Sequence, residues 1–528
     1  MERAVRQAAV SRSARQPAVR QQVAYVRSVP APVGGWNAKD ALAAMKPTDA
    51  VALENLFPTT SYVESRGGYT SHATGMSGTG KTLATYNALT GTNKMLCFTE
   101  QGVYNVTSAG AVGASLLART NGKHQWVNFG DGTNNYLIAP NGVDAPFYYD
   151  GTTATAVTGA TSPALTGVTT TELVSVFVFK GRLIFIQRAS MSFWYLAAGA
   201  AGGALTEFDL SAEAPAGGFL MAGAAWTMDA GDGIDDYAVF MTSEGEAIVY
   251  RGTNPSSAAT WAKIGTYQIG KPLGRRCLTK YGGDIIVLTQ NGAFPLSSAL
   301  PFASVDSKLA LSFKIENAFN AASSLYSSNF GWRSILYPAK SAFIVNVPMT
   351  EDGEHEQYVM NTITKAWCKF NSWDAEDFAV FNSDLYFCDG SVVYKAWNGT
   401  VDGTDDIILY GKQAFSDYGM PGVQKHVSGY QPVLGINGTL SFLTDIDVDF
   451  KDTPITGTAT YAVAAGAVWD TDLWDTGLWG AGLQIAKEWT SPDEWSGVYI
   501  SGKIKIATDT LTVQWYSSST MFTTGGPL

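Results

Sequence analysis

The stretch MLCFTEQGVYNV, residues 95–106, decides the fold: an apolar strand, a turn that carries a glycine, and a second strand with an aromatic residue. The same unit occurs at six other places between residues 58 and 400. The seven hairpins begin at Met95, Tyr136, Arg182, Tyr237, Asp284, Ala342 and Asp384. Their starts lie 41 to 58 residues apart. A repeat of about 40 to 50 residues made only of strands is typical of propeller blades.

This repeat predicts an all-β protein built on a β-propeller of about seven blades, with six or eight left open. The alternative is a β-sandwich array, but its strands recur about every 8 to 12 residues without a longer period. WD40, kelch and sialidase signatures are absent, so we expect a divergent propeller. The composition agrees, because 55 glycines, 64 aromatic residues and only 15% charged residues suit short strands joined by tight turns.

We divide the chain into four parts. Residues 1–32 form an Arg-rich flexible arm, residues 33–58 a short helical connector, residues 59–425 the propeller, and residues 426–528 a C-terminal β region. The helix is expected between Ala38 and Leu56, where Pro47 interrupts the pattern and Thr48 or Asp49 can cap the second half. The last strands of the C-terminal region could return to close the propeller, because a closed ring leaves no exposed strand edge.

The charges are divided unequally between the arm and the rest of the chain. The arm holds six arginines and one acid, a charge of +5, and the net charge of −11 therefore leaves −16 on the other residues. We expect the arm to order on a partner, although a solvated tail or a transit peptide would have a similar composition. The expected partner contacts are Arg3, Arg6, Arg12, Arg15, Arg20 and Arg27. An acidic body is unsuited to gripping DNA.

One motif suggests a phosphate-binding loop. Residues 75–82, GMSGTGKT, fit the pattern G-x-x-x-x-G-K-[ST] in full. Such a loop must follow a buried strand and open a helix, whose amide groups hold the phosphates. Here the flanks RGGYTSHAT and LATYNALTGTNK are polar or rich in residues that disfavour a helix. We therefore predict a turn between strands, with no nucleotide and no other cofactor.

Acidic residues form the other candidate site. Asp229, Asp232, Asp235 and Asp236 could offer oxygen ligands to Ca²⁺, but their spacing departs from the EF-hand loop, and we favour an exposed acidic turn. Asp445, Asp447 and Asp449 alternate along a strand and are interpreted as a solvated face. The four cysteines and four histidines form no ligand pair, so a zinc site is unsupported. Carboxylates for sugar hydrolysis could be drawn from this supply, but the sequence does not place them.

A tryptophan-rich stretch lies in the C-terminal region. Trp469, Trp474 and Trp479 recur every five residues among Gly and Asp. They could stack on sugars, but such residues more often fix an interface, and we predict partner contacts. No nucleophile motif occurs, so we expect no enzyme. No apolar run is long enough to span a membrane, and no secretory signal is recognisable, so we expect synthesis in a cytoplasm.

Both ends of the chain carry a family resemblance. Residues 34–37 (GGWN), 40–42 (DAL), 45–47 (MKP), 53–58 (LENLFP) and 66–69 (RGGY) resemble the opening of tail nozzle proteins of short-tailed bacteriophages. The W-D-T repeats, WGAGLQ and the ending VQWYSSSTMFTTGGPL resemble the C-terminus of that family. The long arm before Gly34 is not a family feature.

The resemblance implies a structural β-propeller subunit of the virion tail, assembled in the host bacterial cytoplasm. It implies a homohexameric tube below the tail adaptor ring, beside tail fibres, that retains the genome and lets DNA pass without specific binding. A receptor-binding or sugar-binding tail protein is the alternative, and a secreted propeller lectin or adhesin is another. The hairpin period argues against the trimeric β-helices of spikes and depolymerases.

Overall fold

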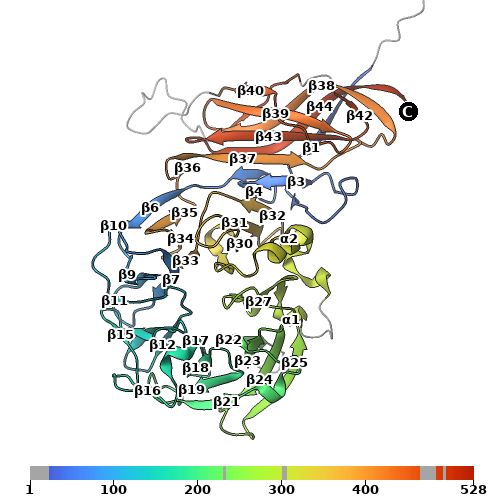
Figure 1. The fold of residues 1–528 in the computed structure, drawn as a ribbon. Coiled ribbons are helices and arrows are strands. Elements are labelled where there is room, and N and C mark those ends of the chain that lie inside the picture. The colour runs from blue at the N-terminus through green and yellow to red at the C-terminus, as the bar shows by residue number, and fades with distance from the viewer. Residues whose placement is uncertain (1–22, 230–233, 300–305, 464–482, 492–494, 528) are drawn as a thin grey trace, which may run out of the picture.

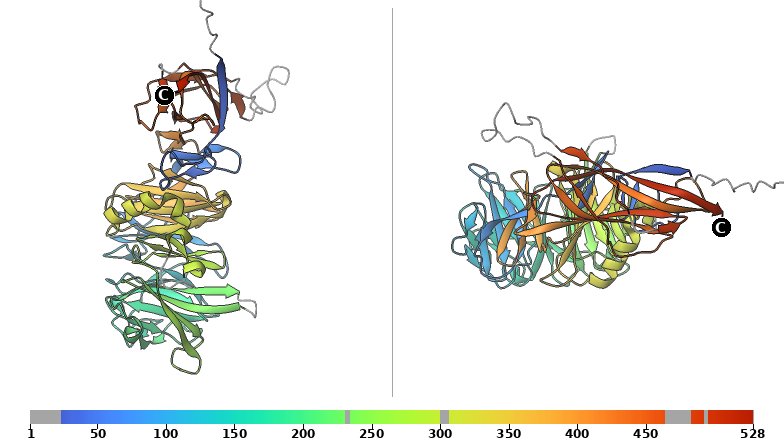
Figure 2. Two further views of the ribbon diagram at one scale, coloured as in Figure 1. Left: turned by 90° about the vertical axis from the view of Figure 1, so that its right-hand side faces the viewer. Right: turned by 90° about the horizontal axis from the view of Figure 1, so that it is seen from above.

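The computed structural model describes residues 23–229, 234–299, 306–463, 483–491 and 495–527. The chain forms a ring of β-sheets with a second β domain beside it (Figure 1). In the views of Figure 2 the ring is a flat disc, and the second domain continues from its edge. The β-propeller predicted from the hairpin period is confirmed. No helix among these residues is long and apolar enough to cross a membrane.

Each predicted hairpin forms the second and third strands of one sheet unit of the ring. The units are numbered here in chain order. Units 1 and 2 contain β7 (Gly80–Tyr86), β8 (Lys94–Thr99), β9 (Gly102–Asn105), β11 (Leu117–Ala118), then β12 (Val127–Gly130), β13 (Asn135–Ala139), β14 (Phe147–Tyr149), β15 (Ala154–Ala156). Units 3 and 4 contain β17 (Leu173–Phe179), β18 (Arg182–Gln187), β19 (Ser192–Tyr195), β21 (Thr206–Asp209), then β22 (Leu220–Asp229), β23 (Ile234–Thr242), β24 (Glu246–Gly252), β25 (Trp261–Gln268).

The remaining units complete the ring. Unit 5 has three strands, β26 (Leu278–Tyr281), β27 (Asp284–Thr289) and β28 (Gly292–Pro295), and unit 6 has β29 (Arg333–Tyr337), β30 (Ala342–Pro348), β31 (His355–Asn361) and β32 (Trp367–Phe370). Unit 7 has β33 (Asp377–Phe381), β34 (Asp384–Asp389), β35 (Val392–Ala396) and β6 (Tyr69–Thr74). Helical segments follow unit 5: α1 (Leu296–Ala299), η3 (Ser307–Leu309), η4 (Leu311–Ile315) and α2 (Glu316–Tyr326). Phe319 of α2 packs into the core shared by units 4 to 6.

The ring is closed by a strand from the N-terminal side. β6, which precedes unit 1 in the chain, pairs antiparallel with β35 of unit 7, with Val393 opposite Ala73. This corrects the expectation that the C-terminal strands close the propeller. The last strand, β44 (Val513–Pro527), pairs instead with β38 (Val423–Ile436), β1 (Ala24–Pro30) and β5 (Val63–Ser65). Closure by β6 covers the outer edge of unit 7 within the same chain.

The second domain, called here the terminal β domain, consists of two sheets. One contains β4 (Leu56–Pro58), β5, β44, β38, β41 (Gln484–Ala486), β1 and β42 (Trp495–Gly497). The other contains β3 (Asp49–Glu54), β37 (Asp405–Gln413), β43 (Ile500–Thr508), β39 (Leu440–Val448) and β40 (Thr458–Tyr461), and it continues through β32 and β36 into units 6 and 7 of the ring. Leu434, Ile504 and Trp515 are buried in the core cluster that both sheets share. The domain therefore draws strands from both ends of the chain and begins before residue 426.

The helix expected between Ala38 and Leu56 is not formed. Residues 38–48 are turns and bends, and Asp49–Glu54 is the strand β3. β3 pairs with β37, with Leu53 opposite Gly411, and contacts β32 through Glu54 and Lys369. The prediction was wrong because the ladder of neighbouring strands outweighs the weak local helix propensity of a segment already interrupted by Pro47.

Part of the N-terminal arm is also ordered within the chain. β1 forms a continuous antiparallel ladder with β44, from Ala24 opposite Thr523 to Pro30 opposite Ser517. The ring of Tyr25 stacks on Phe522 at a centroid distance of 5.9 Å. Residues 24–30 of the predicted arm therefore belong to the terminal β domain, which corrects the boundary expected at residue 32.

The shorter elements are connections between the larger ones. They are β2 (Gly35–Trp36), β10 (Gly110–Ala111), β16 (Leu165–Thr166), β20 (Gly203–Ala204), β36 (Val401–Asp402), η1 (Thr170–Glu172), η2 (Ser211–Glu213) and η5 (Pro338–Lys340). β36 pairs with β37 of the terminal β domain and with β6 of unit 7, and so links the two parts of the molecule.

Candidate functional site in the propeller channel

The first strands of units 2 to 6 face the middle of the ring (Figure 1). Together they line a cavity of about 660 Å³. Its walls are β12, β17, β22, β26 and β29, together with Arg275 and Arg276, which precede β26. Residues that are far apart in the sequence meet here because each of these five units contributes its first strand. We call this space the channel cavity.

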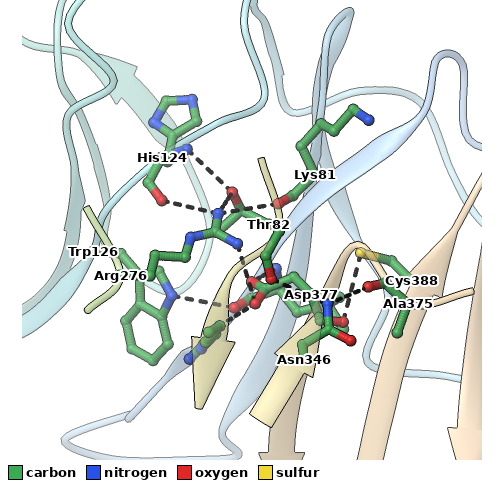
Figure 3. Close-up of polar contacts among 12 residues, drawn as sticks. Lys81, Thr82, His124, Trp126, Arg276, Asn346, Ala375, Asp377 and Cys388 are labelled. Atoms are coloured by element: carbon green, nitrogen blue, oxygen red, sulfur yellow. Dashed lines mark hydrogen bonds and ion pairs between the residues drawn. The ribbon is translucent and has the colours of Figure 1, made fainter. Parts of the chain in front are cut away.

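Arg276 connects four units at the wall of the channel cavity. Its Nη2 donates hydrogen bonds to the carbonyl oxygens of Lys81 at 3.0 Å and His124 at 3.2 Å, and to Thr82 Oγ1 at 2.6 Å (Figure 3). Its Nη1 lies 3.2 Å from Oδ1 of Asp377, at the start of unit 7. A side chain between units 4 and 5 therefore holds units 1, 2 and 7 together.

Asp377 is the buried carboxylate of this network. Its Oδ1 forms ion pairs with Arg276 and with Arg333 of β29, while Oδ2 accepts a hydrogen bond from the Leu83 amide at 2.9 Å. Asp377 is fully buried, whereas Arg333 is 21% exposed. One carboxylate is therefore shared by two arginines, and the group carries excess positive charge.

A second ionic group crosses between units. Lys81 is fully buried and pairs with Asp352, in the turn between β30 and β31, and with Glu376 at 2.9 Å. Burial pulls the pKa of Lys81 down, but the two carboxylates outweigh it and hold this pKa above its usual value. Lys123 of unit 2 lies 2.5 Å from Glu351 of unit 6. Units 1 and 2 are thus tied to units 6 and 7 by charge as well as by apolar packing.

His124 is buried and neutral. Its Nδ1 lies 3.1 Å from the Ala139 carbonyl oxygen, and Nδ2 of Asn141 lies 3.3 Å from its Nε2. The carbonyl requires a proton on Nδ1, and the Asn141 amide requires a lone pair on Nε2, so the neutral tautomer fits both partners. Burial, reinforced by the positive charge of Arg119, lowers the pKa of His124 to about 3.

The segment that matches a phosphate-binding loop joins two strands. β6 ends at Thr74, and β7 begins at Gly80, so Lys81 and Thr82 lie in a strand and not at the start of a helix. The Lys81 amine is occupied by carboxylates, and Thr82 Oγ1 donates to the Gly122 carbonyl at 2.6 Å. The predicted turn between strands is confirmed; the absence of nucleotide binding stays a prediction.

Three of the four candidate calcium ligands lie in the strands β22 and β23. Asp229 ends β22 and Asp235 lies in β23, while Asp232 falls outside the described residues. Asp236 forms an ion pair with Lys180 at 2.5 Å and accepts from Thr227. Across the part of the chain that the structure describes, no group of three His, Cys, Asp or Glu side chains could hold a metal ion.

The predicted partner contacts are described only in part. Arg27 lies in β1 and is exposed. The other arginines of the arm and the three tryptophans lie outside the described residues: Arg3, Arg6, Arg12, Arg15, Arg20, Trp469, Trp474 and Trp479. All four cysteines are buried and free, as the sequence predicted.

An ionic group in the terminal β domain was missed by the sequence analysis. Asp447, expected on a solvated face, is fully buried, and its two oxygens lie 2.7 Å from Nζ of Lys412 and of Lys503. Burial raises the pKa of Asp447, but the two lysines outweigh it and hold this pKa below its usual value. The alternation Asp445, Asp447, Asp449 showed which residues share a face, but a period of two does not say which face is buried.

No family model matches the chain, and no curated protein matches its sequence. Among solved structures, BBS1N, crystallised in complex with ARL6DN, is 10% identical over 63% of this chain and 97% of its own, with a TM-score of 0.39. The WD40 domain of Neurospora crassa Pan2 is 8% identical over 62% of this chain and 95% of its own, with a TM-score of 0.36. These weak likenesses carry no argument about function.

Proposed function

We propose that the chain is a structural subunit of a phage tail nozzle, forming a ring-shaped conduit that retains the genome and passes DNA at infection. One observation carries this proposal: the two segments that resemble the family, one near each end of the chain, lie in the same sheet. β4 and β5, from the first segment, and β44, from the last, are neighbours in one sheet, with Val63 opposite Trp515. Sequences that resemble one family at opposite ends of the chain thus build one domain.

Two residues of the RGGY motif, 66–69, occupy positions at which the structure allows little substitution. Arg66 is fully buried, and its two terminal nitrogens contact the two oxygens of Asp402 at 2.8 and 2.6 Å. A Cβ added at Gly68 would lie 1.7 Å from the carbonyl oxygen of Val401. The motif therefore shapes the junction between the propeller and the terminal β domain, which supports a shared architecture as the reason for the resemblance.

In this proposal DNA passes between subunits and not through a propeller. Arg276 and the pair of Lys123 and Glu351 join opposite sides of each ring, and the channel cavity is only about 660 Å³. The number of six subunits comes from the family resemblance alone. Symmetry depends on the geometry of the interfaces between subunits, which one subunit does not reveal. The charge of −16 outside the arm suits a wall along which phosphates find few cations.

The partners follow from the same proposal. The tail adaptor ring would contact one end of the tube, and tail fibres would contact its outside. No catalytic residue is proposed. The carboxylates of Glu351, Glu376 and Asp377 are each paired with a lysine or an arginine, which supports a structural role. The exposed outer edge of β1, whose Val26 is 52% exposed, is a candidate contact between neighbouring subunits.

The test is the location of this chain in a virus particle. Particles that contain the chain are labelled with an antibody raised against it and imaged by electron microscopy, and the purified chain is weighed by mass photometry. We expect label at the distal end of a short tail and a six-fold ring in averaged end views. Label on peripheral fibres or spikes, or a trimer that binds on a glycan array, would replace the nozzle by a receptor-binding or sugar-binding tail protein.

A further inference from the structure

The channel cavity is basic although the protein is acidic. Four cationic side chains line it, Arg275, Arg276, Lys280 and Arg333, and none of its described lining residues is Asp or Glu. Within the residues that the structure describes, one carboxylate pairs with this group, that of Asp377, and Arg276 and Arg333 already share it. Four cations and one carboxylate leave a charge of +3 at the cavity wall. The net charge of the whole chain, in contrast, is −11.

Arg275 has no carboxylate partner within the described residues. Its Nη1 donates to the carbonyl oxygens of Leu220 at 3.3 Å and Met221 at 3.0 Å, and its guanidinium lies 5.8 Å from the ring centroid of Phe219. Burial lowers the pKa of Arg275, which reflects the cost of holding its charge away from water. A bound anion would offset that cost.

Arg276 provides a second, independent observation. It is only 8% exposed, and its Nη1 has no hydrogen-bond partner although it lies 3.2 Å from Asp377. A buried guanidinium nitrogen without a hydrogen bond is costly, and native structures seldom leave one so. Arg276 lines the channel cavity and shares its one paired carboxylate, Asp377, with Arg333, so its charge adds to the attraction for an anion there.

We propose that the channel cavity binds a small organic anion with two or more phosphate or carboxylate groups. Nη1 of Arg275 is occupied by two carbonyl oxygens, whereas its Nη2 makes no hydrogen bond within the described residues and can donate a charge-assisted one to an oxygen of such a group. The volume of about 660 Å³ lies in the range of small-molecule sites. Val127, Val176 and Ile335 contribute apolar wall that a carbon skeleton would cover. This proposal is independent of the nozzle assignment.

The test uses the full-length chain, isothermal titration calorimetry at low ionic strength, and two probes, inorganic tripolyphosphate and citrate. We expect at least one probe to bind with one site per chain, and binding to weaken as salt screens the charges. Tighter binding of tripolyphosphate would identify phosphate as the recognised group, and tighter binding of citrate would identify carboxylate.

Three variants assign the site. Arg275→Gln and Lys280→Gln should each weaken binding about tenfold, because each removes one charge-assisted contact. Lys280 is exposed, so its replacement should leave the unfolding temperature unchanged even if Arg275→Gln destabilises the propeller. Lys46→Gln, at an exposed lysine outside the cavity, is the matched control and should bind as the wild type does. No heat of binding at millimolar probe, or equal weakening in all three variants, would overturn the proposal.

Discussion

Arg276 and Asp377 join unit 5 to unit 7 beside the channel cavity, with Nη1 of the arginine 3.2 Å from Oδ1 of the carboxylate. They lie about a hundred residues apart in the sequence and belong to the entry of unit 5 and the first strand of unit 7. Arg333 pairs with the same oxygen of Asp377. Among the described residues, Asp377 is therefore the one acidic side chain that forms an ion pair with both Arg276 and Arg333.

We expect Asp377→Asn to destabilise the propeller. The substitution leaves two arginines near each other without a carboxylate, and breaking a buried ion pair from one side costs on the order of 3–5 kcal/mol. The lower end of that range applies, since Arg333 is partly exposed and can be solvated. Urea unfolding followed by far-UV circular dichroism measures the change.

Asp452→Asn is the matched control for that measurement. Asp452 also pairs with a lysine, Lys412, at 2.8 Å, but it is 80% exposed. An exposed ion pair contributes about 0–1 kcal/mol, so this variant should unfold close to the wild type. Equal losses of unfolding free energy in the two variants would contradict the claim that burial makes the Asp377 ion pairs more stabilising than an exposed pair.

Stability should fall as the pH is lowered through the range in which His124 titrates when unfolded. Burial lowers the pKa of His124 to about 3 in the folded chain, whereas the unfolded value is about 6.5. Between these values the unfolded chain binds a proton that the folded chain does not, so acidification favours unfolding by up to about 1.4 kcal/mol per pH unit.

The variant His124→Asn isolates this contribution. His355, whose pKa is also lowered by burial, acts in the same direction and remains in the variant. We therefore expect unfolding midpoints to decline less steeply in His124→Asn than in the wild type over about pH 6.5 to 5, above the range where most carboxylates titrate. Parallel declines in the two proteins would contradict a neutral, buried His124.

The sequence was informative where a local pattern repeats. The hairpins beginning at Met95 and Asp384 were placed because alternating apolar strands and glycine turns are local features, and their period indicates a propeller. The ionic network was not predictable, since Arg276 and Asp377 acquire a common location only after the ring closes. The segment after Ala38 was misassigned for a related reason: pairing of β3 with β37 and β32, remote in sequence, decides its conformation.

Gly68→Ala should destabilise the junction between the two domains. The added Cβ would lie 1.7 Å from the Val401 carbonyl oxygen and 2.4 Å from its carbon, and these backbone atoms cannot rotate away. Overpacking typically costs about 1–3 kcal/mol, and a clash with backbone belongs at or above the upper end.

Gly113→Ala is the control for the glycine substitution, because nothing lies within 4 Å of a Cβ added there. We expect the free energy of unfolding of this variant to lie within about 0.5 kcal/mol of the wild-type value. Differential scanning calorimetry of both variants reports the comparison. A Gly68→Ala protein that unfolds like Gly113→Ala would show that the junction adjusts without cost.

Two truncations separate the structural and the docking roles of the N-terminal arm. Deleting residues 2–22 keeps β1 and should leave thermal unfolding unchanged, while weakening attachment to the assembled tail if the arginines contact a partner. Deleting residues 2–30 also removes β1, which exposes the edge of β44 and removes the stacking of Tyr25 on Phe522. The loss of the β1–β44 ladder should lower the unfolding temperature of this second protein. An exposed strand edge promotes association, so we also expect the protein to elute as aggregates in size-exclusion chromatography. Equal behaviour of the two truncations in both measurements would mean that β1 does not stabilise the terminal β domain.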